Sequence, residues 1–445
     1  MSFLKNGVKK RSEVEESRAT VNLLLSPQCE SACEPQPEPI MKYGVMTAIS
    51  RDREGLVAKY TDSLRQWGAN LYMGHGQQLG RMFVFDALFQ AEDPDLSRIA
   101  VEMPEKLRDE APSLIEVAAP VAYRNPSAQH YTLNHLSEDQ VGIVSTLAEK
   151  LTIHGASIVD LVSKSYNAAE CGANLFSVDM QVDVPNGTAV RNLRQEFSDL
   201  EKHKGWEIHF DSEPRAGMRV ASTAPYPPSG GVKWTPPTPS ANPSGERPPT
   251  EAPKWAVLST IGTDRPGIIA STANFLAKHK ASIHAQTARR VSELFSSHCL
   301  VKASAADMER VKQDYRETLG DFRPTFVEAP PPTPFDDDLL RLDLTVHALD
   351  EPGIISGLTA PIASHGASIA TLSFGLYPDR RAGSPAGSRA LFVVEMSLLV
   401  RDANASKHIE AGLLALERDR GWEVDYRPAR RTFDTARSEV DDARK

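Results

Sequence analysis

The chain has 445 residues, of which 40% are hydrophobic and 24% are charged, and this composition is typical of a globular protein with several domains. Its formal net charge of -9 argues against a nucleic-acid-binding surface, because contacts to phosphates need clustered lysine and arginine. Only 4 cysteines are present, too few for a disulfide framework in so long a chain, so we expect a reducing, cytoplasmic location.

The first segment, residues 1–40, is predicted to be a disordered tail. It is polar and ends in the proline-rich "CEPQPEPIM". The apolar run Leu23–Leu25 is too short for a signal peptide, and no apolar run in the sequence is long enough to cross a membrane. Because Met41 directly precedes the first strand-like run, translation from Met41 is an open alternative.

The first strand-like run leads into "DREGL", and this phrase returns as "DQVGI", "DRPGI" and "DEPGI". In every copy a glycine follows the aspartate by three residues, and a small polar residue follows the glycine by fifteen. A fixed internal period identifies the folding unit. The aspartate, glycine and polar residue are Asp52, Gly55 and Asn70 in the first copy, Asp139, Gly142 and Ser157 in the second, Asp264, Gly267 and Ser282 in the third, and Asp350, Gly353 and Ser368 in the fourth.

The spacing of the copies predicts two tandem pairs joined by a linker. The first two aspartates are 87 residues apart and the last two 86, whereas the middle interval is 125. Proline and glycine in "TPPTPSANPSGERPP" disfavour helix and sheet and indicate a flexible linker. The predicted domains are 41–124, 129–211, 254–329 and 339–428, with a linker at 212–253 and a second disordered tail at 429–445.

The second copy gives the secondary structure of the unit. After the anchor, Ile143, Leu147 and Leu151 recur at helical spacing, and residues 174–184 alternate as a half-buried strand does. With a strand at 157–166, a second helix at 188–205 and a last strand at 206–210, the order is β-α-β-β-α-β. This order predicts an α+β, ferredoxin-like fold, with an antiparallel sheet and both helices on one face. The longer hairpin of the fourth copy, residues 377–390, is predicted to be a surface loop.

The anchor has two interpretations that its spacing leaves open. Asp264 can cap the following helix, with Pro266 in the first turn and Gly267 packed closely against the sheet. Alternatively, the free N–H groups of the helix can bind a ligand carboxylate while the aspartate binds an ammonium group, as a free amino acid would require.

Other residues are given structural roles. His154 and His365, each followed by glycine, are predicted to end helices. Cys29 and Cys33 have no matching second pair, so no metal site is expected.

The unit, with "DRPGI" at the first turn and "ASI" at the second strand, resembles the ACT domain, a small-molecule-sensing module, over residues 42–427. The tandem arrangement is similar to that of the glycine cleavage system transcriptional repressor and its relatives. In the ACT domains of phosphoglycerate dehydrogenases, asparagines at the loop and second-strand positions hold serine. The resemblance therefore implies that the four aspartates, the glycines beside them and the four strand residues form ligand sites. Only Asn70 keeps the amide.

The loops of the first two copies depart from the other two. Glu54 and Val141 stand where the third and fourth copies have Pro266 and Pro352, so the first two copies are candidates for weaker or silent sites.

The resemblance implies a regulatory protein rather than an enzyme. No phosphate-binding loop, nucleophile elbow, zinc motif or dinucleotide fingerprint occurs, and the four copies use nearly all of the folded chain. We expect a sensor of a glycine-class or serine-class amino acid that acts on a protein partner such as a transcription regulator. No cofactor, nucleic acid or membrane contact is expected, and a homodimer through the sheets is possible. The alternative is a ligand-independent scaffold for protein–protein contacts.

The length of the first helix predicts how the sites form. Eleven helical residues span roughly 16 Å, so one amino acid cannot touch the aspartate and the strand residue of the same copy. We therefore expect sites shared within each tandem pair: Asp264 with Ser368, Asp350 with Ser282, Asp52 with Ser157, and Asp139 with Asn70. Trp206 and Trp422, in the repeated phrases "KHKGWEIHF" and "RDRGWEVDY", are predicted to be buried against the neighbouring unit.

Overall fold

The computed structural model describes residues 40–117, 127–168, 173–212, 252–318, 322–332, 339–351, 353–377 and 391–431. The expected N-terminal tail up to Pro39, linker residues 213–251 and residues 432–445 lie outside the described residues, as do Cys29, Cys33, Cys171, Pro352 and residues 378–390 of the last hairpin. The last strand continues to Arg431, past the predicted domain end at residue 428, because its final residues pair with Leu340 and Arg341.

The helices and strands follow the predicted order β-α-β-β-α-β in four successive segments, which we call the first to fourth repeats. The first repeat holds β1 (Met41–Arg51), α1 (Leu56–Gln66), β2 (Asn70–Leu79), β3 (Met82–Glu92), α2 (Asp93–Lys106), the 3₁₀ turn η1 (Arg108–Glu110) and β4 (Ser113–Val117). The second holds β5 (Gln129–Glu138), α3 (Ile143–Ile153), β6 (Ser157–Ala168), β7 (Ala173–Val184), α4 (Gly187–Lys204) and β8 (Glu207–Ser212).

The third and fourth repeats have the same order of strands and helices, and their described residues include no 3₁₀ turn. The third holds β9 (Lys254–Thr263), α5 (Ile268–Lys278), β10 (Ser282–Val291), β11 (Leu294–Ala303), α6 (Ala305–Thr318) and β12 (Arg323–Ala329). The fourth holds β13 (Leu340–Leu349), α7 (Ile354–Ser364), β14 (Ser368–Tyr377), β15 (Leu391–Val400), α8 (Ala403–Arg420) and β16 (Glu423–Arg431).

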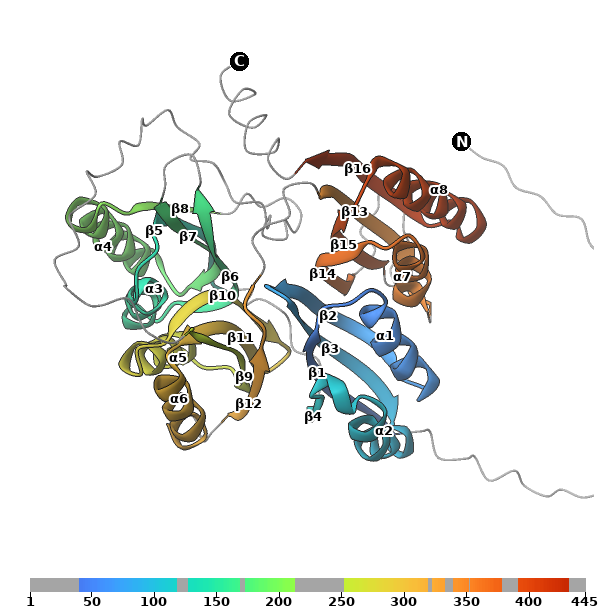
Figure 1. Ribbon diagram of the computed structural model, residues 1–445, viewed down its shortest axis with the longest axis horizontal. Coiled ribbons are helices and arrows are strands. Elements are labelled where there is room, and N and C mark those ends of the chain that lie inside the picture. The colour runs from blue at the N-terminus through green and yellow to red at the C-terminus, as the bar shows by residue number, and fades with distance from the viewer. Residues whose placement is uncertain are drawn as a thin grey trace, which may run out of the picture. The chain divides into compact units, whose positions relative to one another are not determined.

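The described strands form two 8-stranded sheets in which every pairing is antiparallel (Figure 1). The first sheet has the order β16-β13-β15-β14-β2-β3-β1-β4, and the second has the order β12-β9-β11-β10-β6-β7-β5-β8. With eight α-helices among the described residues, the protein is α+β and consistent with repeated ferredoxin-like units.

The sheets join different repeats from those expected. Strand β14 pairs with β2, from Thr371 opposite Gln77 to Gly375 opposite Met73, and β10 pairs with β6. The first repeat therefore shares a sheet with the fourth, and the second with the third. The prediction that sequence neighbours pack as pairs is wrong, because loop closure costs little more for a distant partner, and the fit between strand edges then decides the pairing. A cut in the linker would leave both sheets made of segments from either side of it.

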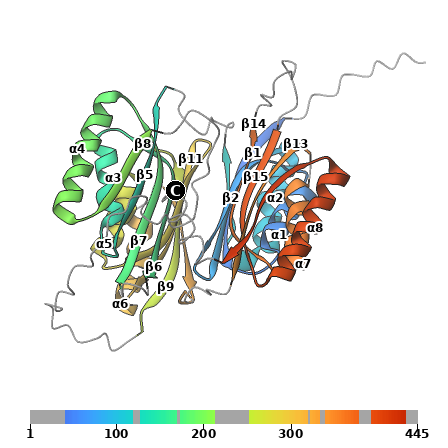
Figure 2. The same cartoon turned by 90° about the horizontal axis from the view of Figure 1, so that it is seen from above.

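Each sheet carries its helices on one face (Figure 2), where α1 packs against α7 and α3 against α5. The opposite faces of the two sheets contact each other. Apolar side chains such as Leu79 and Met82 pack there with Leu300, and polar pairs such as His298 with Asp86 lie beside them. This second contact explains why Gln181 is buried on the face of β7 that was expected to meet solvent.

The two predicted tryptophans are buried, each with 5% of its surface exposed. Trp206 lies beside the His135 ring of β5, and Trp422 lies against Gly357 of α7. Each ring therefore packs against its own repeat, and the prediction of contact with a neighbouring repeat is wrong. Burial follows from position, since both residues precede a sheet-edge strand that covers the core between sheet and helices.

Candidate functional site

The glycine of each anchor directly precedes a helix and has a left-handed backbone. The φ angles are 81° at Gly55, 97° at Gly142, 91° at Gly267 and 94° at Gly353, and no side chain at these positions caps the helix. The interpretation of Asp264 as the helix cap is therefore wrong, and Pro266 lies in the turn before the helix. Glycine is needed because this conformation strains any residue with a Cβ.

Close packing of helix against sheet does not explain these glycines. A Cβ added at Gly55 would meet no atom within 4 Å, and one at Gly142 would meet only Ser145 Oγ, at 3.7 Å. The space beside the first two anchors is consequently open, and a ligand can approach the backbone there.

Three of the anchor aspartates accept a hydrogen bond from the residue 26 positions later, on the second strand of the same repeat. Gln78 Nε2 donates to Asp52 at 2.6 Å, Ser165 Oγ donates to Asp139 at 2.7 Å, and Arg290 Nε donates to Asp264 at 2.7 Å. Sequence reasoning missed these partners. In the sequence, only their constant distance of 26 residues from the aspartate could have identified them, because the three side chains have nothing in common except a hydrogen-bond donor.

The fourth aspartate differs. The residue 26 positions after Asp350 is Leu376, which has no donor. Burial raises the pKa of Asp350, and the side chain of Asn70, from the first repeat, lowers it. The only amide among the four strand positions thus interacts with a loop of another repeat.

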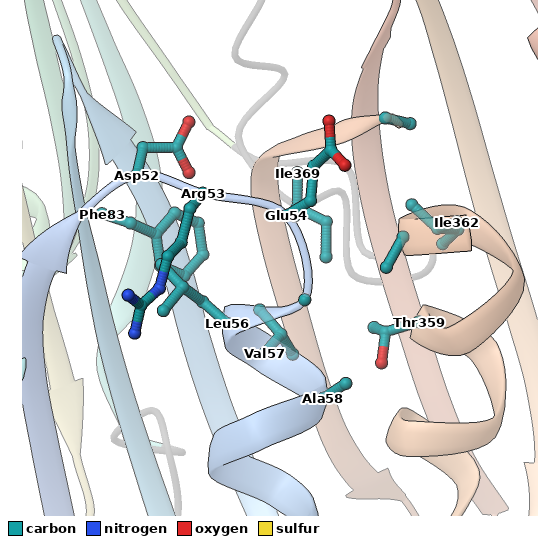
Figure 3. Close-up of a pocket in the computed structure, with 13 residues that line it drawn as sticks. Asp52, Arg53, Glu54, Leu56, Val57, Ala58, Phe83, Thr359, Ile362 and Ile369 are labelled. Atoms are coloured by element: carbon teal, nitrogen blue, oxygen red, sulfur yellow. The ribbon is translucent and has the colours of Figure 1, made fainter. Parts of the chain in front are cut away.

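Loops and strand starts from different repeats meet at both ends of each helix pair. The first hollow, about 300 Å³ and open to solvent, is lined by residues 52–58 of the first repeat and by Ala367 and Ile369 of the fourth, which flank Ser368. Figure 3 shows Leu56 and Val57 on one side and Ile362 and Ile369 on the other, with the carboxylates of Asp52 and Glu54 at the loop end.

The second hollow has about the same size, 310 Å³. It lies between residues 140–145 of the second repeat and residues 281–283 of the third, so the loop of Asp139 meets Ser282. Its lining residues include no charged side chain.

The structure therefore brings together loop and strand residues from different repeats, but in other combinations than predicted. The Asp52 loop meets the segment around Ser368, the Asp139 loop meets Ser282, Asp350 meets Asn70, and Asp264 meets Ser157. The expected partners were wrong because they assumed that neighbouring repeats share a sheet.

At the remaining two ends of the helix pairs, side chains from different repeats approach each other directly. Asn70 reaches Asp350 at one of them. At the other, the Arg290 guanidinium lies between Asp264 and Ser157, with Nη2 donating to Ser157 Oγ at 2.6 Å and Nη1 lying 3.5 Å from Asp183.

The carboxyl group of Asp52, in the first hollow, is strongly affected by burial. Burial raises the pKa of Asp52 to about 6, against the opposing effect of the hydrogen bond from Gln78. Arg53, one of the two arginines that flank Asp52 in sequence, binds the fully buried Glu110 at 2.6 Å instead of Asp52. A carboxylate that is desolvated in this way is stabilised by an added cation, such as a ligand ammonium group.

The two predicted histidine positions end their helices. His154 and His365 directly follow the last residues of α3 and α7 as their C-caps, and each precedes a glycine with φ 67°. His154 Nε2 lies 3.0 Å from Glu196, and the His365 ring stacks on His408. Within the described ranges no cluster of metal-ligating side chains is found, and no helix there is long and apolar enough to cross a membrane.

No family model matches this chain. A stretch of 53 residues, 12% of the chain, is 42% identical to a UPF0237 protein of Methanopyrus kandleri and spans 59% of that protein. Because the match is confined to this part of both proteins, it does not assign the chain to that family.

Three solved structures illustrate the likeness in fold. A protein of unknown function from Galdieria sulphuraria is 22% identical, with 39% of this chain and 98% of that chain covered and a TM-score of 0.35. A putative glycine cleavage system transcriptional repressor is 16% identical, with 39% and 99% covered and a TM-score of 0.31. Aspartate kinase from Synechocystis is 14% identical, with 84% and 55% covered and a TM-score of 0.28.

Proposed function

We propose that the chain is a non-catalytic regulatory protein made of four ACT domains, which senses a small amino acid of the glycine or serine class. One observation carries this proposal. The first hollow combines an uncapped helix N-terminus and a desolvated carboxylate from one repeat with an apolar wall from another.

A free amino acid matches these groups. The N–H groups of the first turn of α1 have no acceptor within the helix, so they can bind the ligand carboxylate. The ligand ammonium binds Asp52 and offsets the cost of keeping this carboxylate charged. The hollow is shallow, since its volume of about 300 Å³ includes open solvent, and it therefore suits a small side chain.

Residues of two repeats line the hollow, so a bound ligand can change how these repeats pack and thereby regulate a partner. A ligand there contacts the α1 loop and the start of β14, so it stabilises one packing of α1 against α7 over others. The change is passed to a protein partner, such as a cytoplasmic transcription regulator. The net charge of -9 favours a protein partner over DNA, and homodimers can form through the edges of the sheets.

A ligand-independent scaffold is the second candidate. It is favoured by the two ends at which protein side chains link an anchor aspartate to another repeat, Asp350 through Asn70 and Asp264 through Arg290 and Ser157, because these anchors serve packing without any ligand.

A thermal-shift screen of the full chain against the twenty amino acids separates the two candidates. A ligand that binds only the folded state raises the melting temperature by mass action. The shift is expected to be smaller in Asp52→Asn and unchanged in Asp62→Asn, a control on the exposed surface of α1. If no amino acid shifts the wild type, the scaffold is the better description.

A further inference from the structure

The Asp264 end of the α3–α5 pair is distinguished by two largely buried carboxylates that approach the same guanidinium. Asp264 lies in the third loop, and Asp183 stands opposite Ser157 in the β6–β7 hairpin. Their side chains are only 19% and 3% exposed. Two carboxylates with so little water around them require a nearby positive charge.

Arg290 supplies that charge between the two carboxylates, and His130 Nδ1 lies 2.7 Å from the other oxygen of Asp183. The side chain of Arg290 is 11% exposed, its Nε donates to Asp264, and its two terminal nitrogens face Asp183 and Ser157. Arg290 and Asp264 belong to the third repeat, whereas Asp183 and Ser157 belong to the second. The guanidinium therefore bridges the two repeats at a loop-to-strand junction.

The equivalent positions elsewhere lack both charges. The residue opposite the strand start is Gln90 in the first repeat, Lys302 in the third and Leu399 in the fourth. The residues equivalent to Arg290 are Gln78, Ser165 and Leu376. Asp183 is the only acid and Arg290 the only cation in their respective sets, so the pair belongs to this end alone.

We propose that Arg290 is a built-in occupant of the third-loop site, where its guanidinium takes the place that a ligand ammonium takes in the first hollow. This end is thereby closed to ligand, and the open sites are those of the Asp52 and Asp139 loops. The proposal rests on the proposed function for its amino-acid ligand, but the cation site itself does not. Without the Arg290 side chain, the site binds a small guanidinium or alkylammonium ion.

The test uses the full chain with Arg290→Met, which keeps an unbranched stem and removes the charge. The probe is methylguanidinium chloride, measured by titration calorimetry and thermal shift against equal concentrations of sodium chloride. Any binding of methylguanidinium by the wild type at the open Asp52 site is the baseline, and we expect Arg290→Met to bind one more ion per chain, saturably, than the wild type does. Gln78→Met, the matched change in the first repeat, should show the same number of bound ions as the wild type. Arg290→Lys should remain closed, because its ammonium stays in the site.

Absence of saturable binding in Arg290→Met, or equal binding in the wild type, would overturn the proposal. If Arg290→Met does not fold, the double variant Asp183→Asn/Arg290→Met removes the second carboxylate and with it the unbalanced pair. The double variant is expected to bind methylguanidinium saturably through Asp264, above the level of the wild type. Its failure to bind would equally overturn the proposal.

Titration of the same variants with glycine and L-serine separates this proposal from the proposed function. An extra equivalent of amino acid bound by Arg290→Met over the wild type supports both. If no variant binds either amino acid while Arg290→Met binds methylguanidinium, the cation site stands and sensing of these two amino acids fails. If the wild type binds an amino acid and Arg290→Met gains neither an amino-acid site nor methylguanidinium binding, the internal occupant is refuted and sensing stands.

Discussion

At one end of the α3–α5 helix pair, residues 140–145 face residues 281–283 across a hollow, whereas at the other end Arg290 fills the space between Asp264 and Ser157. Both ends carry the same anchor, and both helices begin after a glycine with a left-handed backbone. The residue that meets the aspartate differs: it is Ser165 at the open end and Arg290 at the closed end.

This difference shows that the anchor fixes the backbone conformation of the loop. The residue 26 positions later, on the second strand of the repeat, then decides whether the site is open. The first sheet shows the same contrast between an open and a closed end, with different side chains. Its Asp52 end is a hollow, and its Asp350 end interacts with Asn70. Each helix pair thus has one open and one closed end. The open ends belong to the first two repeats, whose loops have Glu54 and Val141 where the third and fourth repeats have proline.

The largest expected effect tests whether the two sheets have equivalent cores. Trp422→Ala and Trp206→Ala should each cost about 3–5 kcal/mol in the free energy of unfolding, the usual cost of deleting a core aromatic. Urea denaturation followed by circular dichroism measures both. The Phe variants sharpen the comparison, since Trp422 Nε1 donates to Glu351 at 3.2 Å, whereas Trp206 Nε1 has no hydrogen-bond partner among the described residues. A near-neutral result for either Ala variant would break the equivalence.

The second prediction compares the closed end with the open one. Arg290→Met should cost about 3 kcal/mol, because it leaves Asp264 and Asp183 without the cation between them. Gln78→Met removes one hydrogen bond to Asp52 and should cost about 1 kcal/mol. Denaturant midpoints of the two variants give the difference. Equal costs would mean that Arg290 contributes only a hydrogen bond.

The third prediction concerns the charge in the first hollow. The pKa of Asp52 is raised to about 6, so between about pH 4 and pH 6 the folded state binds this proton more tightly than the unfolded state does. Wild-type stability therefore falls as the pH rises through this window, whereas an asparagine does not titrate. Asp52→Asn should be more stable than the wild type by about 1–2 kcal/mol at pH 7, after allowance for partial exposure, and lose this advantage below about pH 4.

Melting temperatures across the pH range check this prediction, with Asp62→Asn, a change of aspartate to asparagine on the outer surface of the same helix, measured beside it. A constant difference between Asp52→Asn and the wild type from pH 4 to pH 7 would contradict it.

The smallest expected effect concerns the glycines. Gly55→Ala should cost about 1 kcal/mol from its left-handed backbone alone, because an added Cβ meets open space. Gly267→Ala places a Cβ 3.4 Å from Thr152, an ordinary contact, and should cost about the same. Chemical denaturation of both variants tests this equality. A much larger cost at Gly267 would show that the closed end is packed around its loop as well as around Arg290.

The sequence by itself determined the repeated unit and its local structure. Apolar spacing placed α3 on Ile143, Leu147 and Leu151, and the His-Gly pairs marked the ends of α3 and α7. These features depend on residues close in the chain, where periodicity and backbone preference decide. The domain boundaries and the amino-acid ligand remain predictions.

The tertiary structure decided which repeats meet. No local pattern distinguishes β14 from another edge as the partner of β2, because pairing depends on the fit of two surfaces far apart in sequence. That choice sets every loop partner, including Ser157 for Asp264. It also brought Asp183 next to Arg290, so a loop that reads in sequence like an open site is filled by the protein's own side chain.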